Sequence, residues 1–168
     1  MPRVLIDHYR AGFAAAYGTD PFHAFRKNLA AASPAEWDVQ PSHWSRDEFG
    51  DQPELSICDI ALHVGGGFVM YTDRAFGEAR LEWGDIAMPP SRDMTSVLAW
   101  LDEVHAGFAA GIAALTDDAE LAEMRDAPWR TPLTRAQLIG LMVNHQLYHS
   151  GEVNRQRALL RGSTGWDR

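Results

Sequence analysis

The strongest constraint on the fold is the spacing of the apolar residues, which recur every three or four positions along most of the chain. In one segment, Val97, Leu101 and Val104 are followed at the same spacing by Phe108 and Ile112. This spacing places apolar side chains on one face of an α-helix, whereas a half-buried strand needs a period of two. No convincing stretch with a period of two is present, so the sequence predicts an all-α fold.

Signals for helix starts and ends divide the chain into segments. Ser33 with Glu36, and Ser56 with Asp59, have the spacing of capping boxes, in which each side chain caps the other's backbone N–H. Glycine is typical just after a helix and proline in its first turn. We expect helices over residues 2–17, 21–32, 33–38, 56–76, 92–115 and 132–161, with Asp20 and Ser91 as further N-caps and Gly18, Gly77 and Gly162 at helix ends.

Four of these helices are long enough to form a bundle. Residues 39–55, 78–91 and 116–131 are expected to be connections, and their length is compatible with a crossover topology. The sequence therefore predicts a four-helix bundle with extra short helices. The apolar faces expected for the first two segments consist of Leu5, Tyr9 and Phe13, and of Phe22, Phe25 and Leu29.

Composition narrows the functional classes. The chain has 168 residues, the size of one domain, which we expect to cover residues 1–168 with its core at about 20–162. The single cysteine, Cys58, excludes an intrachain disulfide and a cysteine-rich metal site. The formal net charge of −8 argues against nucleic-acid binding, and the apolar runs are too short to span a membrane. With no recognisable signal peptide, we expect a cytoplasmic protein.

Two of the seven histidines, His145 and His149, are four residues apart in a helical segment. This spacing places both imidazoles on one helix face, where they can bind one metal ion. Gln146 stands where metalloproteases of the HExxH class have their glutamate. The alternative is a pair of core histidines satisfied by hydrogen bonds. No Glu-x-x-His motif occurs, which argues against a di-iron carboxylate site.

A third metal ligand would come from another helix. His63 is in the middle of a predicted helix and is one candidate, while His105 on the inward face of residues 92–115 is the rival. Gly65, Gly66 and Gly67 follow His63 directly, and they permit either close helix packing or free space above a metal ion. We expect Cys58 to point away from this site, Asp59 to cap its own helix, and His8, His23 and His43 to be surface or packing residues.

Several segments together resemble the DinB/YfiT-like family of metal-binding helical bundles. His63 is followed about eighty residues later by His145, His149 and the run HSGEVNRQRALL. The stretches Leu29–Trp37 and Ser56–His63 are similar to the end of the family's first bundle helix and the start of its second. The resemblance covers about residues 20–162. The glycine run after His63 and Glu152, where the family often has glutamine, depart from the family pattern.

The resemblance implies a divalent metal held by His63, His145 and His149. It also implies a homodimer and a metal-dependent thiol S-transferase or isomerase that uses a low-molecular-weight thiol of the mycothiol or bacillithiol type. A set of three histidines suits Zn²⁺ first, with Ni²⁺ and Fe²⁺ as alternatives.

Two further side chains are candidates for this small-molecule chemistry. Glu152, one turn after His149, is a candidate catalytic residue that would orient a ligand or move a proton, unless it is only a surface carboxylate. Arg157, with Arg155 beside it, is a candidate for binding a thiol's carboxylates, or else a solvated charge.

Two other functions remain open at this stage. A metal-dependent hydrolase would activate water at the same site, and a non-catalytic, metal-stabilised dimeric stress or binding protein would use the metal structurally. Trp37, Trp44, Trp83 and Trp129 are then candidates for an apolar interface or pocket, or simply packing residues.

Overall fold

The computed structural model describes residues 3–40, 55–128 and 131–162, and most of them are helical. The α-helices are α1 (Val4–Ala14), α2 (Phe25–Ala30), α3 (Pro34–Trp37), α4 (Ile57–Phe76), α5 (Met94–Ala114) and α6 (Arg135–Leu160). A π-helical turn at Ala15–Thr19 extends α1, and 3₁₀ turns occupy Trp83–Asp85 and Asp118–Ala122. The predicted all-α fold is confirmed.

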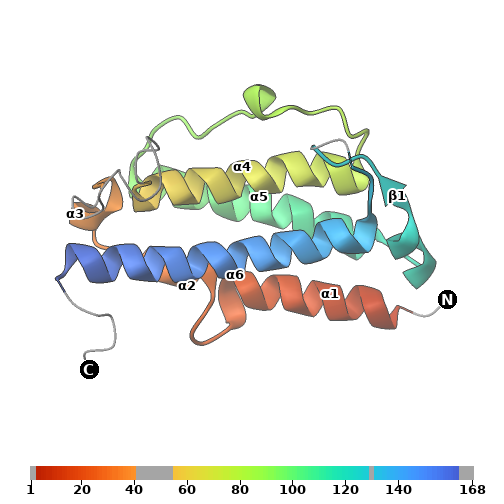
Figure 1. Ribbon diagram of the computed structural model, residues 1–168, viewed down its shortest axis with the longest axis horizontal. Helices are drawn as coiled ribbons and strands as arrows, with labels where there is room; N and C mark the ends of the chain where they lie inside the picture. Colours follow the sequence, from red (N-terminus) through yellow and green to blue (C-terminus); the bar gives the residue numbers. More distant parts are fainter. Residues whose placement is uncertain (1–2, 41–54, 129–130, 163–168) are drawn as a thin grey trace.

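The long helices lie side by side in a bundle (Figure 1). α1 and α2 follow each other along one edge, and α6 runs beside them in the same direction. α4 and α5 run together in the opposite direction, joined by a long connection that returns along the length of α4. The bundle therefore has the crossover topology that the long connections allowed.

One hydrophobic core joins the helices. It includes Ile6 and Phe13 of α1, Phe68 of α4, Phe108 of α5 and Leu138 of α6, each almost fully buried. Burying this apolar surface is the main force that holds the helices together. α4 contacts both α5 and α6, so side chains on the facing sides of α4 and α6 meet.

Both predicted capping boxes are present. In α3, the backbone N–H of Ser33 donates to Glu36, and in α4 the backbone N–H of Ser56 donates to Asp59. The Ser56 hydroxyl in turn accepts from the backbone N–H of Asp59. These bonds form between near neighbours in sequence, so the local pattern was enough to predict them.

Other local predictions were wrong. Asp20 does not begin a helix: its carboxylate accepts from the N–H groups of Phe22 and His23 in a turn, and α2 starts only at Phe25. As a result, Phe22 is 71% exposed instead of lying on an apolar face. In the first turn of α1 the buried residue is Ile6, not its neighbour Leu5, whereas Phe13 is buried as predicted.

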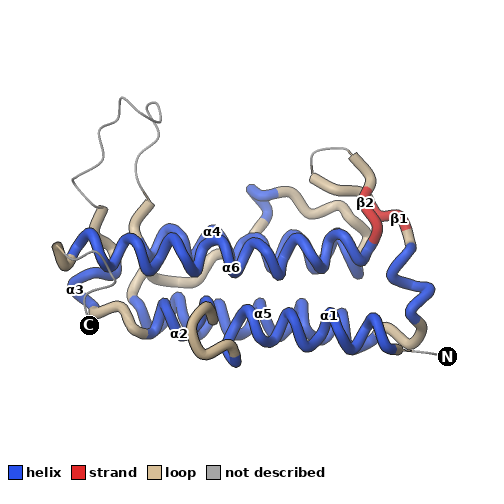
Figure 2. Tube along the Cα trace, turned by 60° about the horizontal axis from the view of Figure 1, so that its bottom comes forward, coloured by secondary structure: helices blue, strands red, loops and turns tan. Residues whose placement is uncertain are grey.

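Some helix ends also differ from those predicted from the sequence. Asp93, not Ser91, caps α5, because its carboxylate accepts from the N–H of Ser96. The helical turn after α1 continues through Gly18 to Thr19. The sequence also missed a short antiparallel pair, β1 (Met124–Arg125) with β2 (Leu133–Thr134), near the start of α6 (Figure 2).

Among the described residues, α5 is the one helix long and apolar enough to cross a membrane by length and composition. Its residues Val97, Leu101, Phe108 and Ile112 are buried in the bundle core, as in the core helices of soluble proteins. The connection expected at residues 39–55 lies mostly outside the described residues.

Candidate metal centre

Three histidines meet between α4 and α6. His63 comes from α4, and His145 and His149 come from consecutive turns of α6. The four-residue spacing on α6 places both of its imidazoles on the face that packs against α4. The nitrogen atoms that these three side chains offer to a metal all lie within 4.8 Å of one another.

The imidazoles approach one another through the same ring atom. The Nε2 atom of His145 lies 3.0 Å from Nε2 of His63 and 2.9 Å from Nε2 of His149. The rings meet edge to face, with centroids 4.5 to 5.0 Å apart. Three nitrogen atoms therefore converge on one point instead of each finding its own partner.

Glu152 fixes the tautomer of a neutral His149 ring. Its Oε2 atom lies 2.6 Å from Nδ1 of His149, one turn earlier on α6. A carboxylate only accepts hydrogen bonds, so Nδ1 carries the proton and Nε2 presents a lone pair to the other histidines. A carboxylate behind a histidine is a common arrangement in metal sites, where it orients the ring and makes it a stronger ligand.

The imidazoles of His63 and His145 favour the neutral form. Burial lowers the pKa of His63, and the positive charge of a protonated His149 would lower it further. Burial, followed by the same effect of His149 and His63, lowers the pKa of His145 to about 3. Neutral imidazole is the form that binds a metal, so these pKa shifts favour ligation at ordinary pH.

The donor set fits a cation better than it fits hydrogen bonds. A proton on Nε2 of His145 would point at one neighbouring Nε2 and leave the other close contact without a hydrogen. A small cation that accepts three lone pairs relieves this mismatch, and three histidines are an established zinc ligand set.

The side of the site at His63 is open. Among the described residues, the ligand cluster contains only these three side chains. His149 is 6% exposed, but His63 lies at the surface. Three protein ligands leave at least one position on a metal ion for an outside molecule, which is typical of catalytic rather than structural zinc sites.

The family assignment agrees with this site. A family model described as the DinB superfamily matches residues 22–153, which is most of the chain. This protein belongs to the DinB superfamily. No curated protein matches it.

His105 is not part of the centre of this DinB-superfamily protein. Its ring stacks between Phe13, at a centroid distance of 4.6 Å, and Tyr17, at 3.6 Å. Burial lowers the pKa of His105 to about 4. This histidine is therefore an aromatic packing residue, and His63, not His105, is the one that lies with His145 and His149.

The other expectations near the site hold. Cys58 is buried and its Sγ points to the carbonyl of Arg92, away from the histidines. Asp59 caps α4 and forms an ion pair with Arg92. The described surface histidines, His8 and His23, are exposed, whereas His43 lies outside the described residues.

The glycine run has a separate reason at each position. A Cβ on Gly65 would overlap the ring of Trp100, and one on Gly66 would lie 2.7 Å from the ring of Trp83. A Cβ on Gly67 would lie 3.4 Å from Cε1 of His145. Close packing is therefore the reason for the first two glycines, and only Gly67 borders a ligand.

Arg157 remains a prediction. It is two turns beyond His149, or about 12 Å along α6. Its Nη1 donates to Asn154 at 3.4 Å, and its buried Nε has no partner among the described residues. Burial and the neighbouring charge of Arg161 lower its pKa.

The sequence did not place two aromatic residues beside the centre, although Trp83 was a candidate for an apolar interface or pocket. The ring of Trp83 lies 5.6 Å from that of His63, and the ring of Tyr148 lies 4.9 Å from that of His149. Tyr148 could have been found from the sequence, because it directly precedes His149. Trp83 is twenty residues from His63 in the sequence. The one sequence feature that relates to its position is Gly66, whose missing side chain leaves space for the indole.

Proposed function

We propose that this protein is a metal-dependent thiol S-transferase that uses a low-molecular-weight thiol, of the mycothiol or bacillithiol type. The observation that carries the proposal is the convergence of three Nε2 atoms at a site open beside His63. A divalent cation held there would lower the pKa of an incoming thiol and orient its sulfur. Zn²⁺ suits the site best, with Ni²⁺ and Fe²⁺ as alternatives.

The protein's own residues have distinct tasks in this proposal. The imidazoles of His63, His145 and His149 hold the cation, and being neutral they leave it a full positive charge. Glu152 acts as a positioning residue rather than a catalytic one, because its carboxylate contacts His149. The sulfur would bond to the electrophilic carbon of the second substrate. The leaving group would depart with its electron pair, and the thiol proton would pass to water.

The geometry favours thiol transfer over hydrolysis. A hydrolase that relies on a general base would use a carboxylate free to take a proton from water, and Glu152 is the candidate on α6. Its Oε2 is already committed to Nδ1 of His149. A thiol bound to a cation needs no such base, because it is far more acidic than water.

The experiment has two stages. The purified protein, with any tag removed, is loaded with Zn²⁺ and its metal content is measured beside that of a His149→Ala variant. Both proteins are then assayed for transfer of mycothiol, bacillithiol or cysteine to 1-chloro-2,4-dinitrobenzene, with release of chloride. We expect one zinc ion per chain and thiol transfer in the wild type, and neither in the variant.

Each failure has its own meaning. Zinc binding without transfer of any thiol would contradict the transferase and favour a structural metal in a dimeric binding protein. Hydrolysis of ester substrates by the loaded protein would favour the hydrolase instead. A homodimer and a cytoplasmic location are parts of the same proposal. Gel filtration coupled to light scattering measures the molar mass and so tests the homodimer.

A further inference from the structure

The connection between α4 and α5, residues 77–93, runs back along α4 and carries Trp83 in a single 3₁₀ turn (Figure 1). A connection of this length could place the tryptophan anywhere in solvent. Instead, the indole lies beside the metal centre, 5.6 Å from the ring of His63. The contacts that hold it there show that this position is built into the fold.

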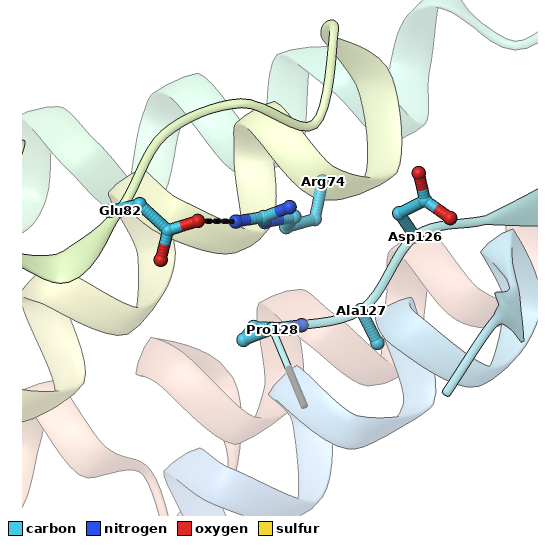
Figure 3. Close-up of a pocket in the computed structure, with 5 residues that line it drawn as sticks. All are labelled: Arg74, Glu82, Asp126, Ala127 and Pro128. Atoms are coloured by element: carbon cyan, nitrogen blue, oxygen red, sulfur yellow. Dashed lines mark hydrogen bonds and ion pairs between the residues drawn. The ribbon is translucent and has the colours of Figure 1, made fainter. Parts of the chain in front are cut away.

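The start of the connection is fixed to the end of α4 by two side chains. The carboxylate of Asp73 accepts from the backbone N–H groups of Glu78, Arg80 and Leu81. Buried Arg74 donates to the carbonyl of Leu81 and forms an ion pair with Glu82, directly before Trp83 (Figure 3).

The tryptophan is also fixed from the other side. Ile86, just after the 3₁₀ turn, is buried in the core. Gly66 lies under the indole, where any Cβ would come within 2.7 Å of the Trp83 ring. A glycine inside a helix costs about 1 kcal/mol relative to alanine. The close packing of Trp83 on α4 therefore requires a residue that makes the helix less stable.

Despite these contacts, Trp83 is not a core residue. It is 42% exposed, while the core aromatics Phe13, Phe68 and Phe108 are almost fully buried. On the α6 side of the centre, Tyr148 is 70% exposed and its ring contacts His149. Two exposed aromatic rings therefore flank the three histidines, one next to His63 and one next to His149.

Carboxylates stand near both rings. Asp85 follows Trp83 in its turn and Glu152 stands behind His149, while the charge of Glu82 is balanced by its ion pair with Arg74. Carboxylates disfavour an anionic ligand, and aromatic rings favour a flat apolar one that can stack on them.

We propose that Trp83 forms the wall of a subsite for a flat, uncharged, apolar group, which is the electrophile in the proposed thiol transfer. The inference rests on that function for the identity of the ligand as a substrate. The subsite itself rests on the position of Trp83 over Gly66 and beside His63. The open side of the centre at His63 lets such a group lie next to an incoming sulfur.

The test uses a probe that binds without reacting. The zinc-loaded protein is labelled with 5-fluorotryptophan, and the ¹⁹F signal of Trp83 is assigned from its loss in Trp83→Phe. The protein is then titrated with 1,3-dinitrobenzene, a flat uncharged ring with no leaving group. We expect the Trp83 signal to shift to saturation, while the signal of Trp100, which packs over Gly65, stays in place.

Three variants make the result specific. Trp83→Ala should weaken dinitrobenzene binding at least about fivefold, from lost stacking. Gly66→Ala should weaken it by displacing the indole while leaving Trp83 in the chain. Trp100→Ala is the matched control, because it removes the indole that packs on the neighbouring Gly65 and leaves Trp83 and Gly66 unchanged. All three variants should still bind one zinc ion, which shows that they are folded.

The outcomes separate the subsite from the function. No saturable shift of the Trp83 signal, or equal affinity in Trp83→Ala and wild type, would overturn the subsite even if thiol transfer is found. A Trp83 shift in a protein that binds zinc but transfers no thiol would keep the subsite and remove the transferase. If zinc does not bind, the same titration of the metal-free protein still decides whether Trp83 binds the ring.

Discussion

Two regions of the bundle each contain histidine between packed helices, and they use it in opposite ways. Between α4 and α6, three imidazoles turn their Nε2 atoms toward one point, with Glu152 behind His149. Between α1 and α5, His105 is stacked between Phe13 and Tyr17. Burial lowers the pKa of His145 and of His105 alike, so a lowered pKa alone does not mark a metal ligand.

The neighbouring groups make the difference. In the α1–α5 region the polar groups beside the histidine pair with one another: the Tyr17 hydroxyl donates to Asp102, and Arg26 forms an ion pair with the same carboxylate at 2.8 Å. Nε2 of His105 is buried without a hydrogen-bond partner among the described residues, but no other ring nitrogen converges on it there. The α4–α6 region leaves close contacts between nitrogen atoms that hydrogen atoms alone do not fill. The comparison teaches that convergence of lone pairs, and not burial, identifies the metal centre.

The largest expected effect separates the two regions directly. His149→Ala removes one of three ligands, so we expect loss of bound zinc at stoichiometric concentrations. His105→Phe should keep one zinc per chain, because His105 lies outside the cluster. Elemental analysis after dialysis measures both, and zinc retained by the His149 variant would contradict the ligand set.

The carboxylate behind His149 should have the next largest effect. Glu152→Ala removes the acceptor of Nδ1–H, so zinc affinity should fall about 10- to 100-fold, as is typical for such partners. Glu152→Gln should recover part of the affinity, since an amide oxygen still accepts from Nδ1.

Competition with a chromogenic chelator gives these affinities. Glu103→Ala on α5 is the matched control, because Glu103 is an exposed carboxylate outside the histidine cluster. Equal affinity of Glu152→Ala and Glu103→Ala would show that Glu152 does not support the site.

The stacked histidine should affect stability through pH. The pKa of His105 is about 4 in the folded protein and 6.5 unfolded, so the unfolded chain binds more protons between these values. Stability of the metal-free protein should therefore fall as pH drops from about 6.5 to 4. His105→Phe should reduce that fall by about 1–2 kcal/mol, after discounting for partial exposure.

Urea unfolding of the metal-free protein at several pH values measures this change. Burial of His145 contributes to the same pH range, so some dependence should remain in the variant. An identical pH profile for wild type and His105→Phe would show that His105 is protonated as easily in the fold as in the unfolded chain.

The smallest expected effect concerns Tyr17. Tyr17→Phe keeps the ring stacked on His105 and removes only the hydrogen bond to Asp102. We expect a loss of about 1 kcal/mol in the free energy of unfolding, with zinc affinity unchanged. A change in zinc affinity would show that the packing around His105 and the histidine cluster between α4 and α6 are energetically coupled.

The sequence predicted features that depend on local spacing. The capping boxes at Ser33 and Ser56 and the shared face of His145 and His149 all form within one or two helical turns. The resemblance to the family supplied His63, which helix spacing alone left in competition with His105. Its position next to α6 depends on the packing of α4, which no local pattern encodes.

Features that depend on a competing local turn or on distant contacts were missed or wrong. Phe22 has the spacing of an apolar helix face, but the Asp20 carboxylate holds it in a turn. The β1–β2 pair joins two residues on each strand across a connection, which is too short to show a period. Trp83 comes beside His63 only because Asp73 and Arg74 direct the connection back along α4.

The most direct test of the central claim is a ¹⁵N NMR spectrum of the histidine side chains before and after addition of one equivalent of Zn²⁺. We predict that three histidines, His63, His145 and His149, change to a form with the metal on Nε2 and the proton on Nδ1, while His105 keeps its metal-free signals. Binding through Nδ1, a shift of His105, or no change in these three signals would contradict the three-histidine centre.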